Sequence, residues 1–378
     1  MLTIIMLILS TGAILALGSR TVWSLSRYHV VSPVAPLIDD IPTVSVCIAA
    51  RNETHALAQC LEQVLRSDYK KLEILVLDDG STDDTSLIIK SFANAGVRFI
   101  PGKQLPIGWL GKNHAYKTLS DEASGDILLY IDVDTVLSQS SIGQLVAYFT
   151  RSKLAMLSVL PRREDSQRFS AIAGTMRYFW ELILGTRSSP PAASAIWMVD
   201  SVAIKQEGIG LENYGLSVRP ERHMARQLNM LGKYEYIVGT ASLGVRYEKH
   251  VQSQYETALR LYYPMTGRTI VKWLFCTIFL LLLLVPLGVG VTPELNDINL
   301  VWAVSLTLLT AGIFGLFVTA TYGGPLRMLR VIAGPFLIIQ ELVLLTLSYR
   351  KYRSGTVTWK GRSVTDQTQN HDALEINE

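Results

Sequence analysis

Residues 127–135 read Ile-Leu-Leu-Tyr-Ile-Asp-Val-Asp-Thr, and the predicted fold and chemistry of the chain both start from this stretch. Its five leading apolar residues predict a short strand that is buried on both faces of a sheet. Asp132 and Asp134 come directly after that strand. In open α/β sheets the carboxyl ends of the strands face the ligand crevice, so we expect both carboxylates there. They would form an all-oxygen site suited to Mg²⁺ or Mn²⁺, or else a strand-end turn that caps the next helix.

The chain before this strand alternates between strand and helix patterns. We expect strands at residues 44–49, 72–77, 97–100 and 126–131, and helices at residues 54–67, 87–93 and 112–123. This alternation is typical of a parallel, doubly wound sheet, so the fold class is predicted to be α/β and Rossmann-like. Residues 140–263 have a mixed pattern that is harder to interpret.

The composition is that of a membrane protein. Of the 378 residues, 49% are hydrophobic and 18% are charged, which is unusually apolar for a soluble chain. A net charge of +3 is too small to indicate a nucleic-acid partner. The three cysteines, Cys47, Cys60 and Cys276, have no zinc-binding spacing, and we interpret them as packing residues in a reducing compartment.

The first apolar segment, residues 2–17, carries its positive charges behind it, at Arg20 and Arg27. A cleaved signal peptide has positive charges before its apolar run, so this order favours an anchor helix whose C-terminal end lies in the cytoplasm. A soluble domain that follows the anchor is then also cytoplasmic, and the cell (inner) membrane is the expected location.

Three more apolar segments follow, at residues 273–291, 300–321 and 331–349. The first two predict spanning helices, and the acidic loop between them is expected outside. The third has basic residues at both ends and Pro335 near its start, which favours an interfacial helix over a spanning one. The expected regions are an anchor at 1–25, a linker at 26–41, a soluble α/β domain at 42–265, a membrane region at 266–350, and a basic segment with a polar tail at 351–378.

Four motifs surround the expected strand ends. They are Val46-Cys-Ile-Ala-Ala-Arg-Asn-Glu53, Leu75-Val-Leu-Asp-Asp-Gly-Ser-Thr-Asp83, Gly108-Trp-Leu-Gly-Lys-Asn-His-Ala115 and Tyr130-Ile-Asp-Val-Asp134. Together they resemble inverting, family 2 glycosyltransferases with the GT-A fold, the nucleotide-diphospho-sugar transferase fold. The resemblance covers roughly residues 42–150 and implies that the domain at 42–265 is a GT-A domain flanked by transmembrane helices.

Two further features are similar to the subgroup of that family that glycosylates lipids. One is the Gly-Trp-Leu-Gly-Lys stretch at residues 108–112, and the other is Trp359-Lys-Gly-Arg362 near the C-terminus. This subgroup includes hopene-associated, carotenoid (diaponeurosporenoate-type) and, more distantly, ceramide glycosyltransferases. The resemblance implies a UDP-sugar donor, a membrane lipid acceptor such as an isoprenoid, hopanoid, carotenoid or sphingolipid, and Mg²⁺ or Mn²⁺ as cofactor.

The resemblance also implies roles for single residues around the nucleotide. Asp134 would bind the metal, and Asp132 would assist it or hold the ribose. Asp79 would accept hydrogen bonds from the uracil or ribose, and Glu53 would line the crevice. The backbone near Ala50 would contact the base, and Lys112 would contact the diphosphate. Lys112 is otherwise a solvated residue at a helix start, although a cation gains nothing from that end of a helix dipole.

The expected general base lies further along the chain. An inverting transfer needs one group to take the proton from the acceptor. The nearest match to the acidic pair of the family is at Glu221, but Arg222 stands where an aspartate is expected, so His223 is a second candidate. Glu221 after Pro220 also fits an ordinary first turn of a helix. Asp200, at another expected strand end, is a weaker candidate for contact with the acceptor.

Two other functions remain open at this point. A GT-A domain that has lost its chemistry and only binds nucleotide-sugars is supported by Arg222, but the intact pair of Asp132 and Asp134 argues against it. A polysaccharide synthase would carry a Gln-x-x-Arg-Trp motif; Gln254 and Arg260 lie in the right region without that spacing or the tryptophan. The cations of Trp359-Lys-Gly-Arg362 are expected beside the diphosphate or lipid headgroups, or in a plain basic tail.

Overall fold

The computed structural model describes residues 1–28, 41–164, 168–206, 209–290 and 296–364. The expected linker, most of the polar tail, and much of the loop between the first two C-terminal apolar segments lie outside the described residues. Two compact units are present, and each draws on separate parts of the chain. The soluble unit comprises residues 28–163, 185–248 and those after 359, and the membrane unit comprises residues 1–27, 164–184 and 249–359.

A mixed seven-stranded sheet, in the order β3-β2-β1-β4-β8-β6-β9, forms the centre of the soluble unit. Its strands are β1 (Val44–Ala50), β2 (Leu72–Asp78), β3 (Val97–Pro101), β4 (Ile127–Ile131), β6 (Met156–Leu160), β8 (Ile196–Asp200) and β9 (Tyr234–Val238). Strands β3, β2, β1 and β4 are parallel, whereas β8 runs antiparallel to both β4 and β6. The chain reverses its winding between β1 and β4, which is where an α/β sheet forms its ligand crevice. The α/β, Rossmann-like prediction is confirmed.

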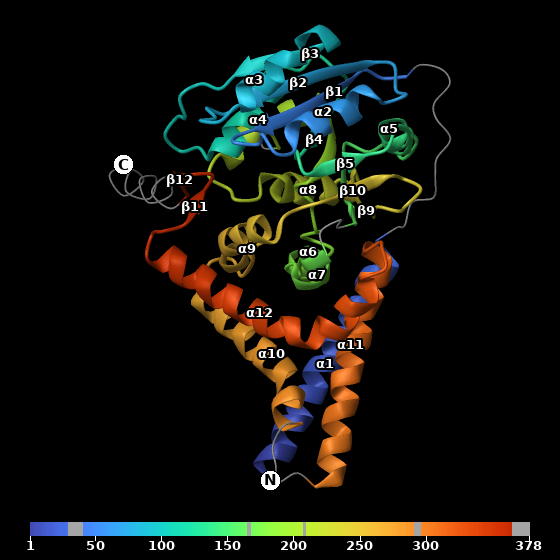
Figure 1. Cartoon of the computed structure of the whole chain (residues 1–378), viewed down its shortest axis with the longest axis vertical. Helices are drawn as coiled ribbons and strands as arrows, with labels where there is room; N and C mark the ends of the chain where they lie inside the picture. Colours follow the sequence, from blue (N-terminus) through green and yellow to red (C-terminus); the bar gives the residue numbers. More distant parts are fainter. Residues whose placement is uncertain (29–40, 165–167, 207–208, 291–295, 365–378) are drawn as a thin grey trace. The chain divides into compact units, whose positions relative to one another are not determined.

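Helices cover both faces of this sheet (Figure 1). They are α2 (Leu57–Leu65), α3 (Thr85–Ser91), α4 (Gly111–Glu122), α5 (Ser141–Arg151) and α8 (Pro220–Met230). Apolar side chains of α2, α3 and α5 pack with one face of β1, β2 and β4 in a single buried core. On the other face, Tyr116 of α4 packs against Tyr130 and Trp197, whose rings stack 4.1 Å apart. Every residue of β4 is buried, as its unbroken apolar run predicts.

Two small sheets accompany the seven-stranded sheet. A three-stranded sheet contains β5 (Thr135–Leu137), β10 (Val245–Tyr247) and β7 (Arg162–Arg163). Near the C-terminus, β11 (Thr358–Trp359) and β12 (Arg362–Ser363) form a hairpin. Its turn residues, Lys360 and Gly361, both have positive φ angles of 48° and 79°. Two successive positive φ angles are the signature of a tight hairpin turn that matches the twist of its strands.

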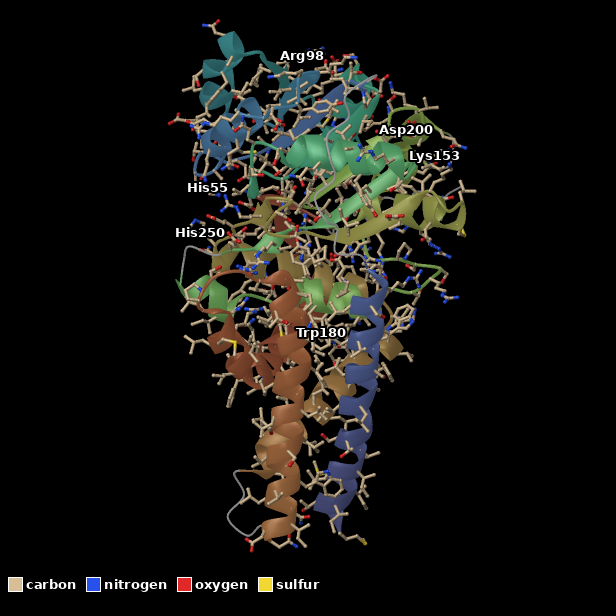
Figure 2. The ribbon with its side chains drawn as sticks, turned by 90° about the vertical axis from the view of Figure 1, so that its right-hand side faces the viewer. His55, Arg98, Lys153, Trp180, Asp200 and His250 are labelled. Atoms are coloured by element: carbon tan, nitrogen blue, oxygen red, sulfur yellow. The ribbon has the colours of Figure 1, made fainter. Side chains whose placement is uncertain are left out.

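The direction of β8 corrects the expectation for Asp200. Because β8 is antiparallel to β4, Asp200 pairs with Ile127 at the beginning of β4, whereas Asp132 follows the end of that strand. Asp200 (labelled in Figure 2) therefore lies at the opposite edge of the sheet from the crevice. Its Oδ1 accepts hydrogen bonds from the backbone N–H groups of Val202 and Ala203, at 2.9 and 3.1 Å, and so it caps the local turn.

The membrane unit contains four helices that are long and apolar enough to cross a membrane, counted over the described parts of the chain. They are α1 (Leu2–Arg27), α10 (Ile270–Val289), α11 (Asp297–Thr321) and α12 (Arg327–Arg353), and they pack with the shorter α6 (Arg168–Ala173), α7 (Arg177–Leu184) and α9 (Val251–Met265). Figure 1 shows α1 and α11 side by side, where the Trp302 indole donates to the Thr11 hydroxyl at 3.2 Å. All four expected apolar segments are helical.

A buried arginine changes how the charges around α12 are interpreted. Arg330 is 2% exposed, and its guanidinium donates to backbone carbonyls within residues 172–175, at 2.9 to 3.4 Å. It therefore holds the segment between α6 and α7 and does not mark a membrane boundary, as a buried cation inside an apolar helix is expected to pair with carbonyls. The length and apolarity of α12 also suffice for a span, so whether this helix spans the membrane or lies at its surface stays a prediction.

Glu341 is the acidic counterpart of Arg330 on α12, and it yields the first testable prediction. It is 1% exposed and accepts from the Met176 backbone N–H at 3.0 Å, the Trp180 indole at 2.7 Å and the Tyr262 hydroxyl at 2.6 Å. Replacing Glu341 by leucine leaves three buried donors without an acceptor, at about 1–3 kcal/mol each. We expect a clearly lower melting temperature in detergent.

The matched control is Glu256→Leu, which changes an exposed glutamate on α9. This variant should melt close to the wild-type temperature. Equal melting of Glu341→Leu and the wild type would contradict a structural role for the buried carboxylate.

Candidate active site

Four carboxylates converge where three neighbouring parallel strands end. Glu53 follows β1, Asp79 follows β2, and Asp132 and Asp134 follow β4. Asp79 is 5% exposed, and the side chains of the other three are also largely shielded from solvent. The carboxyl ends of adjacent parallel strands meet at one edge of a sheet, which is why residues scattered over 80 positions come together. The structure brings these four predicted residues to one crevice.

Asp132 is held by a cation from α4. The Lys112 ammonium lies 2.6 Å from Asp132 Oδ1, and the Tyr116 hydroxyl lies 3.4 Å from the same oxygen. The backbone N–H of Asp132 donates to the Ala195 carbonyl at 2.8 Å, which fixes the turn after β4. Lys112 is mostly buried at this position, so the alternative of a solvated lysine at a helix start is wrong.

Asp134 faces a histidine that the sequence patterns did not single out. His55 Nε2 lies 3.9 Å from Asp134 Oδ1 and 3.8 Å from Glu53 Oε2 (Figure 2). The hydrogen bond to Asp134, followed by the nearby carboxylate of Glu53, raises the pKa of His55 above its ordinary value. Burial is the main reason that the pKa of Glu53 is raised as well. The sequence signal that could have identified His55 is its position two residues after Glu53.

Asp79 is paired with an arginine from the far end of the chain. Arg362 Nη1 lies 2.7 Å from Asp79 Oδ2, and Arg362 Nη2 donates to the Asp79 carbonyl at 3.1 Å. Arg51 also donates to that carbonyl and, at 2.9 Å, to the carbonyl of Gly80. The backbone N–H of Asp79 donates to the Ala50 carbonyl at 2.9 Å. The backbone at Ala50, which is predicted to contact the base, is therefore hydrogen-bonded to the residue that follows β2.

Asp78, next to Asp79, holds the loop after β2. Its Oδ1 accepts from the Ser81 backbone N–H at 3.0 Å and from the Ser81 hydroxyl at 2.5 Å. Its Oδ2 accepts from the Ser86 hydroxyl on α3. Asp78 is thereby committed to the loop, and Asp79 is the carboxylate of this pair that faces the crevice cations.

A lysine of the C-terminal hairpin completes the charged cluster. Lys360 Nζ lies 2.9 Å from Glu53 Oε1 and donates to the Asn52 carbonyl at 3.2 Å. The Lys360 carbonyl in turn accepts from Arg51 Nε at 3.1 Å. The soluble unit therefore pairs the cations of Lys112, Lys360 and Arg362 with crevice carboxylates, and Arg51 binds the backbone carbonyls beside them. Lys360 and Arg362 lie in the Trp-Lys-Gly-Arg motif, for which the sequence could not choose between diphosphate, lipid and solvent.

Glu221 and His223 are placed very differently. Glu221 is 3% exposed in the first turn of α8, with Arg219 Nε 3.7 Å from its carboxylate. Glu221 and Asp132 both act on the buried Tyr116 hydroxyl, whose pKa is raised by burial and then by these two charges. Glu221 is thus an electrostatic neighbour of the crevice, whether or not it also serves the helix as a first-turn acid.

His223 lies on another face of α8, because residues two apart on a helix do not share a face. Its ring stacks on Tyr214 with 4.8 Å between centroids. Partial burial, followed by the charges of nearby arginines, lowers the pKa of His223. The geometry favours Glu221 over His223 as the residue that acts in the crevice.

The carboxylates fit an open metal site. Among the described residues, no group of three or more His, Cys, Asp or Glu side chains is arranged to enclose a metal ion. Mg²⁺ is commonly bound by one or two protein carboxylates together with substrate phosphates and water. Asp134 and Asp132 would supply such a partial set of hard oxygen ligands, and a bound diphosphate would supply the rest.

Comparison with known proteins agrees with this geometry. Residues 45–190 match the family model "Glycosyl transferase family 2". The chain is 26% identical over 167 residues to a poly-beta-1,6-N-acetyl-D-glucosamine synthase of Staphylococcus aureus (strain COL), covering 44% of this chain and 39% of the relative. It is 30% identical over 133 residues to an undecaprenyl-phosphate 4-deoxy-4-formamido-L-arabinose transferase of Pectobacterium carotovorum, covering 34% of this chain and 40% of the relative. The chain thus spans about 40% of the length of these relatives.

The solved structures extend the similarity to most of the chain. A mannosyltransferase of Pyrobaculum calidifontis, solved with GDP-Man and Mn²⁺, has 16% sequence identity and a TM-score of 0.56, covering 92% of this chain and 97% of the other. At this identity the similarity shows the fold. Residues 45–190 therefore resemble a family 2 glycosyltransferase domain, and the fold is the GT-A fold, in a chain that also carries apolar helices.

Proposed function

We propose that the protein transfers a sugar from a UDP-sugar to a membrane lipid, with inversion and with the help of Mg²⁺ or Mn²⁺. One observation carries the proposal: Glu53, Asp79, Asp132 and Asp134 meet at the carboxyl ends of β1, β2 and β4. This is the crevice in which a GT-A fold holds a nucleotide. The apolar helices of the membrane unit support a lipid as acceptor, because a hydrophobic substrate can present its polar end without leaving the bilayer.

Each crevice residue has a proposed role. Asp134 and Asp132 hold the cation, Asp79 accepts hydrogen bonds from the uracil or ribose, and Glu53 with the Ala50 backbone lines the pocket for the nucleoside. A bound divalent cation supplies Lewis-acid stabilisation of the charge that develops on the leaving diphosphate. Lys112 turns from Asp132 toward the diphosphate and adds a second positive charge there.

The proposed general base is Glu221. Inverting transfer is a single in-line displacement, so one group takes the proton from the acceptor as the glycosidic bond forms. Glu221 is a buried carboxylate in the electrostatic neighbourhood of Asp132. The Arg219 guanidinium, whose Nε lies 3.7 Å from the carboxylate, helps to hold Glu221 in place.

An apolar cavity in the membrane unit supports a lipid acceptor. It has a volume of about 250 Å³ and is lined by side chains of α1, α7, α9, α10 and α12. Leu17, Leu280 and Leu345 are among the apolar residues of its wall, and Glu341 and Tyr262 are among the polar ones. We propose that it receives the hydrocarbon chain of the acceptor, since hydrocarbon is the solvent that surrounds apolar membrane helices.

Filling this cavity tests the acceptor assignment. Ala16 lines the cavity from α1 and is itself exposed, so Ala16→Trp adds volume without disturbing a packed core. We expect the KM for the lipid acceptor to rise about tenfold, the scale of a mismatch in a hydrophobic pocket. Steady-state kinetics with detergent-dispersed lipid measures it.

Leu15→Trp, on the neighbouring position of α1 outside the cavity wall, is the matched control and should keep the wild-type KM. Hydrolysis of the donor in the absence of acceptor should be unchanged in both variants. Equal acceptor KM values for the two tryptophan variants would refute the cavity as the acceptor site.

A polysaccharide synthase is the second candidate, because the Staphylococcus aureus relative has that name. Gln254, the glutamine in the region of the synthase motif, is buried and bonded to the Thr175 backbone N–H, the Ser170 hydroxyl and the Lys249 carbonyl. These contacts commit it to the membrane unit. A domain without chemistry is the third reading, and Arg222 remains its support.

Product analysis separates these functions. Purified protein would be incubated with a panel of UDP-sugars and extracted membrane lipids, and the products weighed by mass spectrometry. We expect a lipid carrying one added sugar. Long saccharides on one acceptor would mean a polymerase, and no product with any donor would mean a binding protein. We further propose that the soluble unit faces the cytoplasm at the inner membrane, because Arg20 and Arg27 follow the apolar run of α1.

A further inference from the structure

The tip of the C-terminal hairpin is bound to the two carboxylates that the proposed function assigns to the nucleotide. Arg362 pairs with Asp79 at 2.7 Å, and Lys360 pairs with Glu53 at 2.9 Å. Both cations come from within three residues of each other, at a turn whose positive φ angles fix its conformation. The two carboxylates follow adjacent strands, β1 and β2. A single rigid turn therefore reaches both sides of the crevice wall.

Arg362 is placed at the beginning of α4. A Cβ atom built on Gly111, the first residue of α4, would lie 2.5 Å from Arg362 Nη1 and 2.7 Å from Asp79 Oδ2. The glycine thus lets the guanidinium and the carboxylate approach the first turn of a 12-residue helix. The amino end of a helix attracts anions and disfavours cations. Arg362 is tolerated there because the Asp79 carboxylate accompanies it.

From these contacts we propose that Arg362 and Lys360 are donor-binding residues that exchange partners when the nucleotide enters. Without the donor, they neutralise Asp79 and Glu53. When a UDP-sugar binds, Asp79 turns to the nucleoside, and Arg362 turns to the diphosphate, which brings two negative charges to the amino end of α4. Lys360 follows to the same diphosphate. This inference rests on the proposed function and names the chain segment that would hold the phosphates.

The chemistry of the side chains supports this exchange. A guanidinium forms paired, charge-assisted hydrogen bonds equally well with a carboxylate and with a phosphate, so the arginine loses little when it changes partner. Asp79 would otherwise be buried with its charge uncompensated in the free protein, which is costly. The same arginine can therefore keep the empty crevice neutral and bind the filled one.

Binding measurements on the full-length protein in detergent test the proposal. Calorimetry with Mn²⁺ present would compare UDP, which has the diphosphate, with uridine, which lacks it. For Arg362→Ala we expect UDP to bind at least about tenfold more weakly, the loss of one charge-assisted pair. Uridine should bind as well as to the wild type or better, because Asp79 is released. Lys360→Met should show the same selectivity with a smaller loss.

The controls separate this proposal from a purely structural or a blocking role. Arg98 (labelled in Figure 2) is another arginine of the same sheet and is paired with Glu73 and Glu122. Arg98→Ala should leave the affinities for UDP and uridine unchanged. Arg362→Lys should recover part of the UDP affinity. An equal loss of affinity for UDP and uridine would indicate that Arg362 has a structural role. Tighter UDP binding by Arg362→Ala would indicate that the hairpin blocks the nucleotide site. Either result overturns the proposal.

The proposed function fails separately from this inference. If the wild-type protein binds no UDP, then the donor assignment itself is wrong. If the wild type binds UDP and Arg362→Ala binds it equally well, only the role of the hairpin is wrong.

Discussion

Asp134→Ala is expected to reduce sugar transfer by about a thousandfold or more while the protein stays folded. Asp134 is the second aspartate after β4, and its Oδ1 lies 3.9 Å from His55 Nε2. Losing a metal ligand removes about 4 kcal/mol of stabilisation from the developing negative charge, and each 1.4 kcal/mol is a factor of ten in rate. Initial rates at saturating donor and acceptor, with melting curves alongside, give the measurement.

The matched control for Asp134→Ala is Asp200→Ala. Asp200 also follows a strand of the same sheet but lies at the opposite edge, where it caps a turn. This variant should retain most of its activity and lose at most some stability. Wild-type rates for Asp134→Ala would reject the metal assignment.

Glu221→Gln is expected to lower kcat by about a hundredfold or more, the lower range for a general base. Glutamine keeps the size of the side chain but cannot take a proton. His223→Ala should change kcat by less than about threefold, because the imidazole stacks on Tyr214 at another face of α8. The comparison requires single-turnover rates with donor already bound.

The affinity for UDP provides the control for the base assignment. Glu221→Gln should bind UDP as the wild type does, since Glu221 acts on the acceptor and not on the nucleotide. If His223→Ala loses more rate than Glu221→Gln, the general base is the His223 imidazole. If neither variant loses a hundredfold, the base is a different group.

The parallel half of the sheet could be predicted closely from the sequence. The expected strands at 44–49, 72–77, 97–100 and 126–131 each agree with the structure to within one residue at either end. Short apolar runs followed by polar turns specify such strands with little help from distant residues. Once the strands are parallel, their carboxyl ends share an edge, so the meeting of Glu53, Asp79 and the Asp132–Asp134 pair was also predictable.

The rest depended on contacts that local patterns do not encode. An apolar run of five residues looks the same in a parallel and an antiparallel strand. The direction of β8, and therefore the position of Asp200, could not be predicted from the sequence. The pairing of Arg362 with Asp79 joins residues 283 positions apart. Arg330 seemed to flank an apolar segment but is buried, because its carbonyl partners lie in residues 172–175, far away in the sequence.

The division into units shows the same limit. Residues 164–184 and 249–265, expected in the soluble domain, pack with the apolar helices. Their mixed sequence pattern does not indicate the unit against which each apolar face is buried.

The most direct test of the account is the binding of UDP to the purified full-length protein with and without Mn²⁺ or Mg²⁺. Asp132 and Asp134 repel a diphosphate unless a divalent cation lies between them, so affinity should appear with the metal and fall at least about tenfold after its removal by chelation. Asp134→Ala should show the weak affinity of the metal-free protein under both conditions. Binding of UDP that is equally tight with and without the metal, or no binding to the folded wild-type protein at all, would contradict the account.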